Sequence, residues 1–395
     1  MKALLFRPTP LRLAATWAAG HLSRRAFTAR FAPAGLIEVG DPAVPEGWLA
    51  CRTLLAGVCG SDAKQILLRG ARDNPLTALL SFPHVLGHEG LGRREDTGEM
   101  VVLDPWLSCV ARGLEPCPAC AAGEHSRCRG FLDGALPPGI HLGNCSGAGG
   151  VFAPRFAAHP DRLHAVPPGV SPEAAVLADP VSVSLRHVLS NPPVPGRPAL
   201  VYGCGPLGLA AVALLRRLFP GVPVWAVARY PVQADLARAF GAGEVLCEDG
   251  DALVAAVALL SGARPLRPWS GKAWLQDGAG VVYDTVGTPA TVETALRVVD
   301  AGGTVAISGV EAPRRFEWTL LYFKEVTLRG SNAFAVEEMG GVRRHAFEHY
   351  FDLVGAGLDL TPMITHRFPL ARWKEAVAAL TDRRRSGAVK VLLEP

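Results

Sequence analysis

The sequence has few charged residues and no long block of one sign. Charged residues make up 19% of the 395 residues, and the formal net charge is +4. We therefore expect neither a nucleic-acid partner nor a membrane partner. Glycine and proline stay below the share typical of low-complexity chains, which excludes a disordered chain. The nine cysteines are an odd number, so a fully paired disulfide framework is excluded too.

Export and membrane-spanning segments are also missing from the pattern. The N-terminal apolar run ends at Arg7 and is shorter than the ~7 to 15 residues of a signal-peptide core. The uncharged run at residues 199–215 has three glycines and a proline in its first half, which break a helix and suit a tight turn. We expect a cytoplasmic protein whose cysteines are metal ligands or reactive thiols.

The pattern of apolar, glycine and proline residues changes twice along the chain, which predicts two domains of an α/β protein. Residues 1–170 alternate short apolar runs with glycine and proline, which indicates short strands in a mostly β domain. Residues 171–330 alternate brief β-branched runs with longer helical stretches, which is typical of a doubly wound parallel sheet. Residues 331–395 are mixed again and end in a strand, so we expect them to return to the first domain.

A glycine-rich turn lies near the start of the second predicted domain. The pattern G-x-G-x-x-G directly follows a predicted strand at residues 199–202 and precedes a predicted helix. Its glycines allow a tight turn and close approach of a pyrophosphate, and the helix N-terminus favours negative charge. The residues expected to bind a dinucleotide are Gly203, Gly205, Pro206, Leu207 and Gly208.

Arg229 bears on the choice between NADP and NAD. The second strand of the predicted sheet, at residues 224–227, is followed by Ala-Arg-Tyr, with no acidic residue to bind a ribose 2′-hydroxyl. A guanidinium at this place can pair with a 2′-phosphate. The sequence therefore favours NADP over NAD. In the alternative interpretation, Arg229 stacks on adenine or faces solvent.

Four cysteines lie within 20 residues of one another. Four thiolates form the closed tetrahedral set of a structural zinc site, and C-x-x-C lets two ligands share one ion. We therefore expect a zinc lobe at about residues 105–130, the alternative being unrelated or redox thiols. The four ligands would be Cys109, Cys117, Cys120 and Cys128.

Three short fragments supply the ligands of a second metal site. They are Gly-Val-Cys-Gly-Ser-Asp at 57–62, Gly-His-Glu at 87–89 and Ala-Asp-Pro at 178–180. Each fragment alone is uninformative. Together they provide a thiolate, an imidazole and a carboxylate, which leave a fourth position on Zn²⁺ open for water or substrate. The ligand charges sum to minus two and balance the ion.

The order of these motifs resembles that of zinc-dependent medium-chain dehydrogenases, among them alcohol, polyol and threonine dehydrogenases. The resemblance spans nearly the whole chain and implies a GroES-like catalytic domain and a Rossmann cofactor domain. It implies that Cys59, His88 and Asp179 bind a catalytic zinc. It also implies that Glu89 lies beside the metal or binds it at times, and that Ser61 contacts the substrate hydroxyl and passes its proton outward.

Three positions depart from the family pattern. Five extra residues follow Cys109, which makes it the least secure of the four lobe ligands. Asp179 stands where polyol-type members commonly carry glutamate, which is one methylene longer. Lys64 stands where many members have a histidine that ends a proton relay, and an ammonium with a pKa near 10 is a poor proton acceptor.

The expected function is hydride transfer between an alcohol and NAD(P), with two zinc ions per chain. The expected alcohol is a secondary alcohol or a polyol. The expected partners are a small alcohol or carbonyl substrate and further copies of the chain, as a homodimer or homotetramer. Two alternatives stay open: a zinc-independent enone or quinone reductase of the same architecture, and a non-catalytic nucleotide-binding protein.

Overall fold

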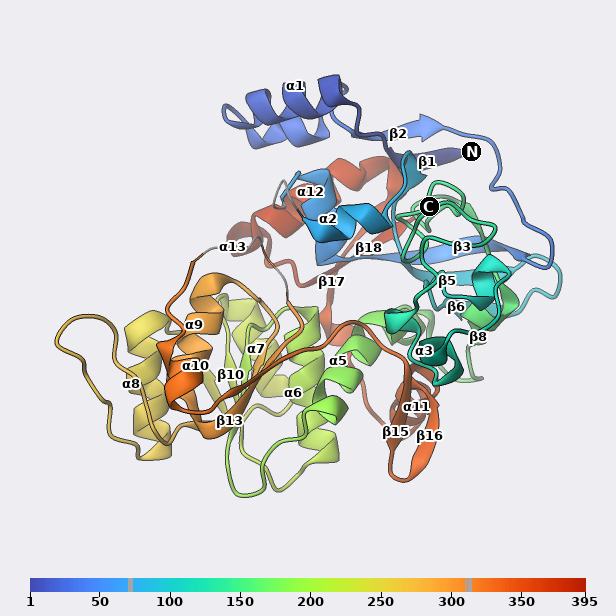
Figure 1. Cartoon of the computed structure of the whole chain (residues 1–395). Helices are drawn as coiled ribbons and strands as arrows, with labels where there is room; N and C mark the ends of the chain where they lie inside the picture. The colour runs from blue at the N-terminus through green and yellow to red at the C-terminus, as the bar shows by residue number, and fades with distance from the viewer. Residues whose placement is uncertain (70–73, 310, 312–314) are drawn as a thin grey trace. The chain divides into compact units, whose positions relative to one another are not determined.

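A computed structural model describes residues 1–69, 74–309, 311 and 315–395 (Figure 1). They form two compact units, one of Met1–Asp179 with Phe347–Pro395 and the other of Pro180–Ala346. The predicted α/β fold class is confirmed, because the first unit is dominated by antiparallel pairings and the second contains a parallel sheet. None of the described helices is both long enough and apolar enough to cross a bilayer.

The first unit is built around a mostly antiparallel sheet. Its spatial order is β17 (Ile364–Pro369), β18 (Lys390–Glu394), β3 (Leu49–Val58), β5 (Glu89–Arg94), β6 (Met100–Leu103) and β8 (Leu163–Ala165), and β7 (Arg155–Ala158) also pairs with β3. Among its described pairings, only the one between β17 and β18 is parallel.

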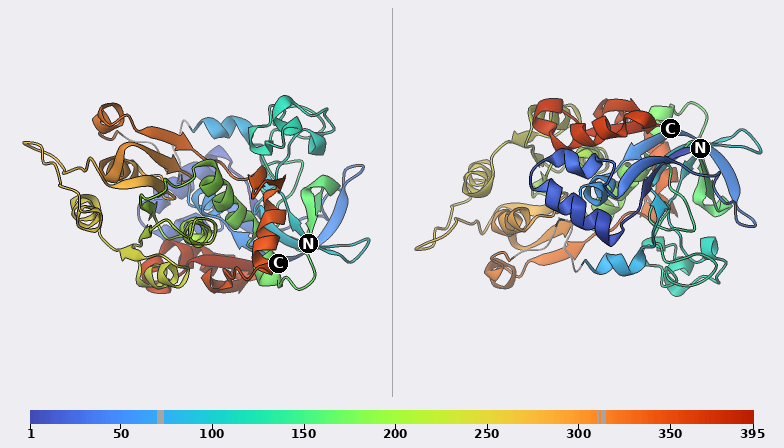
Figure 2. Two further views of the ribbon diagram at one scale, coloured as in Figure 1. Left: turned by 90° about the horizontal axis from the view of Figure 1, so that it is seen from below. Right: turned by 90° about the horizontal axis from the view of Figure 1, so that it is seen from above.

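A smaller antiparallel sheet of the same unit carries a helical insertion. Its order is β2 (Ala34–Glu38), β1 (Lys2–Phe6) and β4 (His84–Val85). Between β1 and β2 the chain forms α1 (Pro10–Gly20) and the 3-10 helix η1 (Arg24–Thr28). The right-hand view of Figure 2 shows these helical segments, in dark blue, beside β1 and β2.

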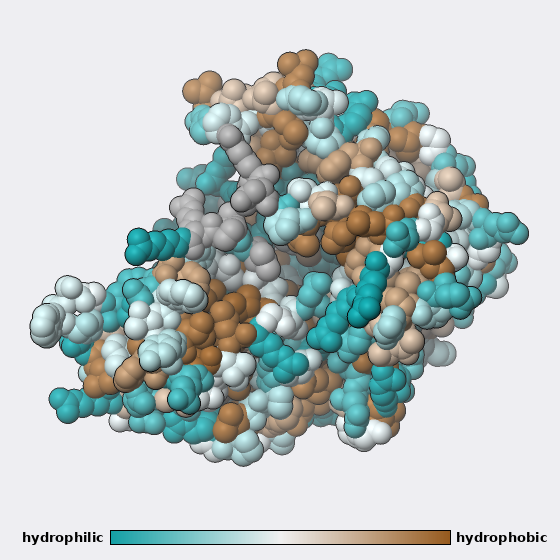
Figure 3. All heavy atoms as spheres, viewed as in Figure 1, coloured by the Kyte–Doolittle hydropathy of each residue, from teal (hydrophilic) through white to brown (hydrophobic). Residues whose placement is uncertain are grey.

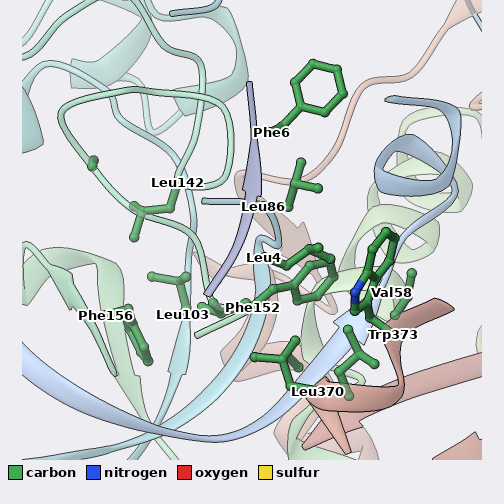
Figure 4. Packing of buried hydrophobic residues seen from close by; sticks show 14 of the residues in the cluster. Leu4, Phe6, Val58, Leu86, Leu103, Leu142, Phe152, Phe156, Leu370 and Trp373 are labelled. Atoms are coloured by element: carbon green, nitrogen blue, oxygen red, sulfur yellow. The ribbon is translucent and has the colours of Figure 1, made fainter. Parts of the chain in front are cut away.

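The remaining helices of the first unit are mostly short, and most of them border strands. They are α2 (Gly60–Ile66), α3 (Pro118–Ala121), α4 (Pro172–Ala175), α11 (Ala346–Gly355), α12 (Trp373–Thr381) and α13 (Arg383–Ser386). The helix α12 is anchored in this unit because its apolar face is buried in the core. Figure 4 shows Leu370 and Trp373 packing with Val58, Leu4 and Phe152.

The second unit holds a sheet whose described pairings are all parallel. Its order is β11 (Glu244–Leu246), β10 (Val224–Val227), β9 (Ala199–Tyr202), β12 (Ala279–Asp284), β13 (Val299–Ile307) and β14 (Thr327–Gly330). This is the order of a doubly wound dinucleotide-binding sheet. The central strands β9, β10 and β12 are buried throughout, as expected when helices cover both faces.

Helices alternate with these strands along the chain. They are α5 (Ala178–Ser190), α6 (Pro206–Leu218), α7 (Pro231–Ala239), α8 (Gly250–Ser261), α9 (Pro289–Val298) and α10 (Thr319–Phe323). After β14 the unit ends in an antiparallel hairpin of β15 (Val336–Met339) and β16 (Val342–His345). The boundary between the units therefore falls after residue 346 rather than at the expected residue 330, because this hairpin belongs to the second unit.

A buried lysine supports the junction between α9 and β13. Lys324 is 2% exposed, and its ammonium donates hydrogen bonds to the carbonyl oxygens of Leu296, at 3.0 Å, and Val299. These carbonyls lie at the C-terminal end of α9, where intrahelical donors run out. Burial lowers the pKa of Lys324 to about 8, although the charges of Asp300 and Asp277 oppose the shift.

The depressed pKa of Lys324 predicts a pH dependence of stability. Between pH 8 and 10.5 the unfolded chain still binds the proton that the folded chain has released, so the free energy of unfolding should rise with pH. The gain from this group should be about 3 kcal/mol across that window. Urea unfolding of the wild type and of Lys324→Met at several pH values should isolate this gain, with Lys374→Met, at an exposed position of α12, as control. If the free energy of unfolding had the same pH dependence in the wild type and Lys324→Met, this prediction would be contradicted.

Candidate metal and cofactor sites

Cys59 lies at the junction of β3 and α2. It is the residue before the helix, and its backbone N–H donates a hydrogen bond of 3.0 Å to Asp62 Oδ2. Asp62 sits in the first turn of α2 and is buried, so this bond fixes how the chain leaves the strand. The thiol is thereby held at one end of the central strand of the large sheet.

The pairing of β3 with β5 brings the Gly-His-Glu fragment beside this thiol. Gly57 is opposite Glu89 in the antiparallel register, and His88 directly precedes β5. As a result, the ligand atoms of Cys59, His88 and Glu89 all lie within 4.8 Å of one another. Three residues that the sequence analysis selected from two separate fragments thus form one cluster.

Asp62 acts on His88 as well as on Cys59. The carboxylate Oδ1 lies 3.6 Å from His88 Nδ1, an ion-pair distance longer than a hydrogen bond. Burial disfavours the imidazolium, but the charge of Asp62 and the proximity of Cys59 outweigh it and raise the pKa of His88 well above its usual value. The pKa of Asp62 is lowered, because the interaction with His88 outweighs its own burial.

Glu89 is buried in an ion pair that the sequence analysis missed. Its carboxylate contacts the ammonium of Lys390 on β18, and both side chains are almost fully inaccessible. The same ammonium donates a 3.4 Å hydrogen bond to the carbonyl oxygen of Val58. A Cβ at Gly57 would collide with the Glu89 carboxylate and come within 3.0 Å of the Lys390 side chain, so glycine makes room for the pair.

Asp179 is buried in the first turn of α5, outside the cluster of three ligand atoms that lie within 4.8 Å. It is nevertheless in electrostatic contact with that cluster. Burial, and next the charge of Glu89, raise the pKa of Asp179 to about 8, while His88 and Lys390 act in the opposite direction. A buried carboxyl in this state is a place where a cation would be stabilised.

Aromatic side chains border the cluster on one side. The ring of His141 lies 4.6 Å from the ring of His88, and Trp106 packs against both His141 and Phe131. Burial, followed by the charge of His88, lowers the pKa of His141 to about 3, so its ring is neutral. Asn144 orders this loop, because its Oδ1 accepts hydrogen bonds from the backbone N–H groups of residues 140 and 141.

Ser61, which was expected to pass the proton outward, and Lys64, which stands where many family members have a relay histidine, differ in exposure. Ser61 is exposed in the first turn, two residues after Cys59. Lys64 is half-buried in the last turn of the helix.

The four lobe cysteines converge on one point. Cys109 precedes a 3-10 turn, Cys117 caps α3, and the sulfur atoms of all four lie within 4.8 Å of one another. The extra residues after Cys109 therefore do not displace it from the group. Hydrogen bonds from the backbone N–H groups of Arg129 and Cys120 lower the pKa of Cys117 to about 6, which favours a thiolate.

Arg112 holds the lobe in shape. Its side chain is 1% exposed, and its three nitrogens donate five hydrogen bonds of 2.8 to 3.0 Å. The acceptors are the carbonyl oxygens of Leu107, Asp133, Leu136, Pro137 and Gly139. A loop-rich segment with few strand or helix hydrogen bonds thus has its buried carbonyls satisfied by one guanidinium.

The glycine turn of the second unit has the expected form. Gly203 follows β9 with φ +96°, and Gly205 precedes α6, whose first residue is Pro206. A Cβ at Gly208 would collide with the Gly203 carbonyl, so close packing of helix on strand requires glycine there. The Gly203 carbonyl accepts a 2.8 Å hydrogen bond from the Thr285 hydroxyl. The first N–H groups of a helix have no acceptor within the helix, so the start of α6 is a place where an anion would bind.

Arg229 lies at the same edge of the sheet as this turn. Val227 of β10 is opposite Tyr202 of β9 in the parallel register, so Arg229 and Gly203 both follow the carboxyl ends of neighbouring strands. The Arg229 side chain is exposed, and its guanidinium lies 5.9 Å from the ring of Tyr230. A cation therefore occupies the place where an acid would select for a 2′-hydroxyl.

Comparison with known proteins agrees with both units. Residues 45–168 match the alcohol dehydrogenase GroES-like domain, and residues 206–355 match the zinc-binding dehydrogenase family. L-threonine 3-dehydrogenase of Saccharopolyspora erythraea is 26% identical over 364 residues, covering 86% of this chain and 90% of that protein. L-idonate 5-dehydrogenase of Vitis vinifera is 26% identical over 358 residues, covering 86% of each.

A solved structure shows the same fold. The crystal structure of 2R,3R-butanediol dehydrogenase from Bacillus subtilis aligns with a TM-score of 0.71 at 21% identity, covering 100% of this chain and 99% of that one. The chain belongs to the zinc-type medium-chain dehydrogenase family and is an oxidoreductase of the alcohol and polyol dehydrogenase class. The predicted combination of a GroES-like and a Rossmann domain is confirmed.

The close packing around Gly57 predicts that a side chain at this position lowers stability. Gly57→Ala should push the Glu89 carboxylate away from Lys390 and lower the free energy of unfolding by about 2 kcal/mol. Gly60→Ala is the matched control, because a Cβ there meets no atom within 4 Å. Chemical denaturation of both variants measures the difference, and equal stability would show that the site tolerates a side chain at Gly57.

Proposed function

We propose that the chain is a zinc-dependent, NADP-preferring dehydrogenase of secondary alcohols or polyols, working as a homodimer or homotetramer. The observation that carries the proposal is the convergence of Cys59, His88 and Glu89 beside the buried Asp179. A thiolate, an imidazole and a carboxylate are the ligand types that a catalytic zinc uses when one position stays open.

The donor set and its charges fit a divalent cation. His88 Nδ1 is buried without a hydrogen bond among the described residues, as expected of a group that awaits a further partner or orients a ligand. Glu89 is neutralised by Lys390. As zinc ligands, Cys59 and Asp179 would each be deprotonated, and Zn²⁺ would balance their two negative charges. We therefore assign Cys59, His88 and Asp179 as the catalytic ligands, with Glu89 beside them.

The four lobe cysteines would hold a second, structural zinc. They offer no open position, because four thiolates complete a tetrahedral site. The lobe is tied to the large sheet by Arg162, which donates a 2.5 Å hydrogen bond to Asp104 and lies 2.9 Å from His125 Nδ1 within the lobe. Metal in the lobe would order this loop without taking part in the reaction.

Zinc at the open site would act as a Lewis acid that lowers the pKa of a substrate hydroxyl. The chain's own residues have separate tasks. Asp62 orients His88 and the backbone of Cys59. The neutral ring of His141 and the indole of Trp106 form an apolar wall that excludes water from the carbon that changes oxidation state. Ser61, exposed on α2, passes the hydroxyl proton outward.

The cofactor supplies the hydride chemistry, and the chain holds it. The N–H groups at the start of α6 would bind the pyrophosphate, with Gly203, Gly205 and Gly208 allowing its approach. Arg229 would pair with a 2′-phosphate, because no acidic residue stands at the end of β10 to prefer a hydroxyl.

The metal assignment predicts that Cys59→Ser and Asp179→Asn each lose one of two bound zinc ions and nearly all turnover. Cofactor affinity should stay within about twofold of the wild type, because the glycine turn is untouched. Elemental analysis and absorbance of reduced nicotinamide, with a panel of secondary alcohols and polyols, measure both. Cys247→Ser, an exposed thiol outside both clusters, is the control.

Other outcomes would identify another function. One zinc per wild-type chain together with reduction of enones or quinones would favour a zinc-independent reductase. Cofactor binding without turnover of any alcohol would favour a non-catalytic protein. Substantial turnover by zinc-free Cys59→Ser would overturn the catalytic site.

The assignment of Arg229 predicts a loss confined to one cofactor. Arg229→Ala should weaken NADP binding by about 10- to 100-fold and leave NAD binding nearly unchanged, because only NADP carries the 2′-phosphate. Titration calorimetry with both cofactors tests this, with Arg238→Ala on α7 as an exposed arginine control. An equal loss for both cofactors would mean that Arg229 stacks on the adenine.

A further inference from the structure

The insertion between β1 and β2 concentrates positive charge. Residues 1–37 contain six lysines and arginines and no aspartate or glutamate, whereas the other 358 residues carry 34 basic and 36 acidic side chains. The whole-chain value of +4 hides this separation. The six are Lys2, Arg7, Arg12, Arg24, Arg25 and Arg30.

One side of α1 is fixed against the rest of its unit. Arg12 donates hydrogen bonds to the carbonyl oxygens of Ala32, at 2.6 Å, and Arg30, at 3.3 Å, and so ties the helix to the segment that enters β2. Thr16 is fully buried, and Gly20 packs against the ring of Phe27, where a Cβ would come within 2.7 Å. The rotation of α1 about its axis is therefore set by packing.

The opposite side of α1 presents apolar side chains to solvent. Leu11 is 80% exposed, Trp17 is 53% exposed, and Leu22, just past the helix, is 91% exposed. Ala14 and Ala18 follow Leu11 at the i+3 and i+7 spacing that lines one helix face, and both are exposed. Figure 3 shows hydrophobic residues at the top of the view, where α1 lies in Figure 1.

Three exposed arginines lie in the segment that directly follows α1. Arg24 and Arg25 begin η1, Arg30 follows it, and all three side chains are exposed. The right-hand view of Figure 2 shows α1 and η1 side by side. We name the combination of Leu11, Ala14, Trp17, Ala18 and Leu22 with Arg24, Arg25 and Arg30 the N-terminal face.

We propose that the N-terminal face docks on an anionic phospholipid bilayer. Helices that lie in a membrane interface insert aliphatic and tryptophan side chains beneath the headgroups while arginines contact the lipid phosphates. The 80% and 91% exposure of the two leucines means that they project from the surface instead of lining a groove, which suits a deformable bilayer better than an acidic peptide. A nucleic acid would use the arginines but gains nothing from the leucines. The sequence analysis predicted no membrane partner because it used the net charge of the whole chain, which hides the basic N-terminal segment.

The proposal can be tested by co-sedimentation of the full chain with vesicles. Vesicles of phosphatidylcholine with about 30 mol% phosphatidylglycerol should bind the protein, pure phosphatidylcholine should bind it at least about tenfold more weakly, and salt should weaken the binding. Zinc content and alcohol turnover should not change, because the N-terminal face contains none of the proposed site residues.

Two double variants, each with a control, separate the contributions of the arginines and the leucines to vesicle binding. Arg24→Gln with Arg25→Gln should lower affinity for the anionic vesicles about 25-fold, whereas Arg264→Gln with Arg267→Gln, the same charge change beside the exposed Trp269, should not. Leu11→Ser with Leu22→Ser should lower it at least about tenfold, whereas Leu259→Ser, at a residue 84% exposed, should not. All of these positions are on the surface, and thermal unfolding checks that each variant is folded.

Several results would overturn the proposal. One is equal binding to neutral and anionic vesicles, or none to either. Another is an equal loss of affinity for anionic vesicles in the test and control variants. A third is preferential binding to a double-stranded oligonucleotide or a poly-glutamate peptide that the leucine variants retain. The last is self-association of the chain that disappears in Leu11→Ser with Leu22→Ser and leaves no vesicle binding at low concentration.

Discussion

The antiparallel pairing of β3 with β5 is the constraint on which the proposed catalytic metal site depends. It places Gly57 opposite Glu89 and so sets Cys59 at one strand end next to His88 at the start of the other. Pairing of β18 with β3 on its other side then delivers Lys390 to Glu89. Because a shift of one residue in either register would turn these side chains to the opposite face, the backbone ladder fixes the donor set before any metal is bound.

The two proposed metal sites are supported by different physical means. The open site is built on sheet strands and a helix start, so its geometry comes from backbone hydrogen bonds and from one buried ion pair. The lobe has little regular structure, and its shape depends on a guanidinium that satisfies five carbonyls. A rigid frame suits a site where a substrate must be oriented, whereas a closed set of thiolates only needs its loop to be held together.

The sequence predicted those parts of the site that depend on local spacing. G-x-G-x-x-G after a strand and C-x-x-C within a cysteine cluster act through nearby backbone, and both are found as expected. Lys390 lies 301 residues from Glu89, and no local pattern connects them, so their pairing became visible only with the strand order. Arg112 was missed because a buried arginine that serves carbonyls has no sequence signature. The charge of the N-terminal face was missed because composition was averaged over two units.

Because Lys390 lies on β18, which is made late in synthesis, Glu89 receives its countercharge late as well. The first unit is made of two segments, and the whole second unit lies between them in the chain. During synthesis the contiguous second unit can fold as soon as it emerges, while Cys59, His88 and Glu89 have been made but Glu89 lacks its countercharge. The proposed catalytic metal site therefore receives this countercharge only after β18 has been made. A chain that stalls earlier exposes a thiol and an uncompensated carboxylate at an incomplete sheet edge.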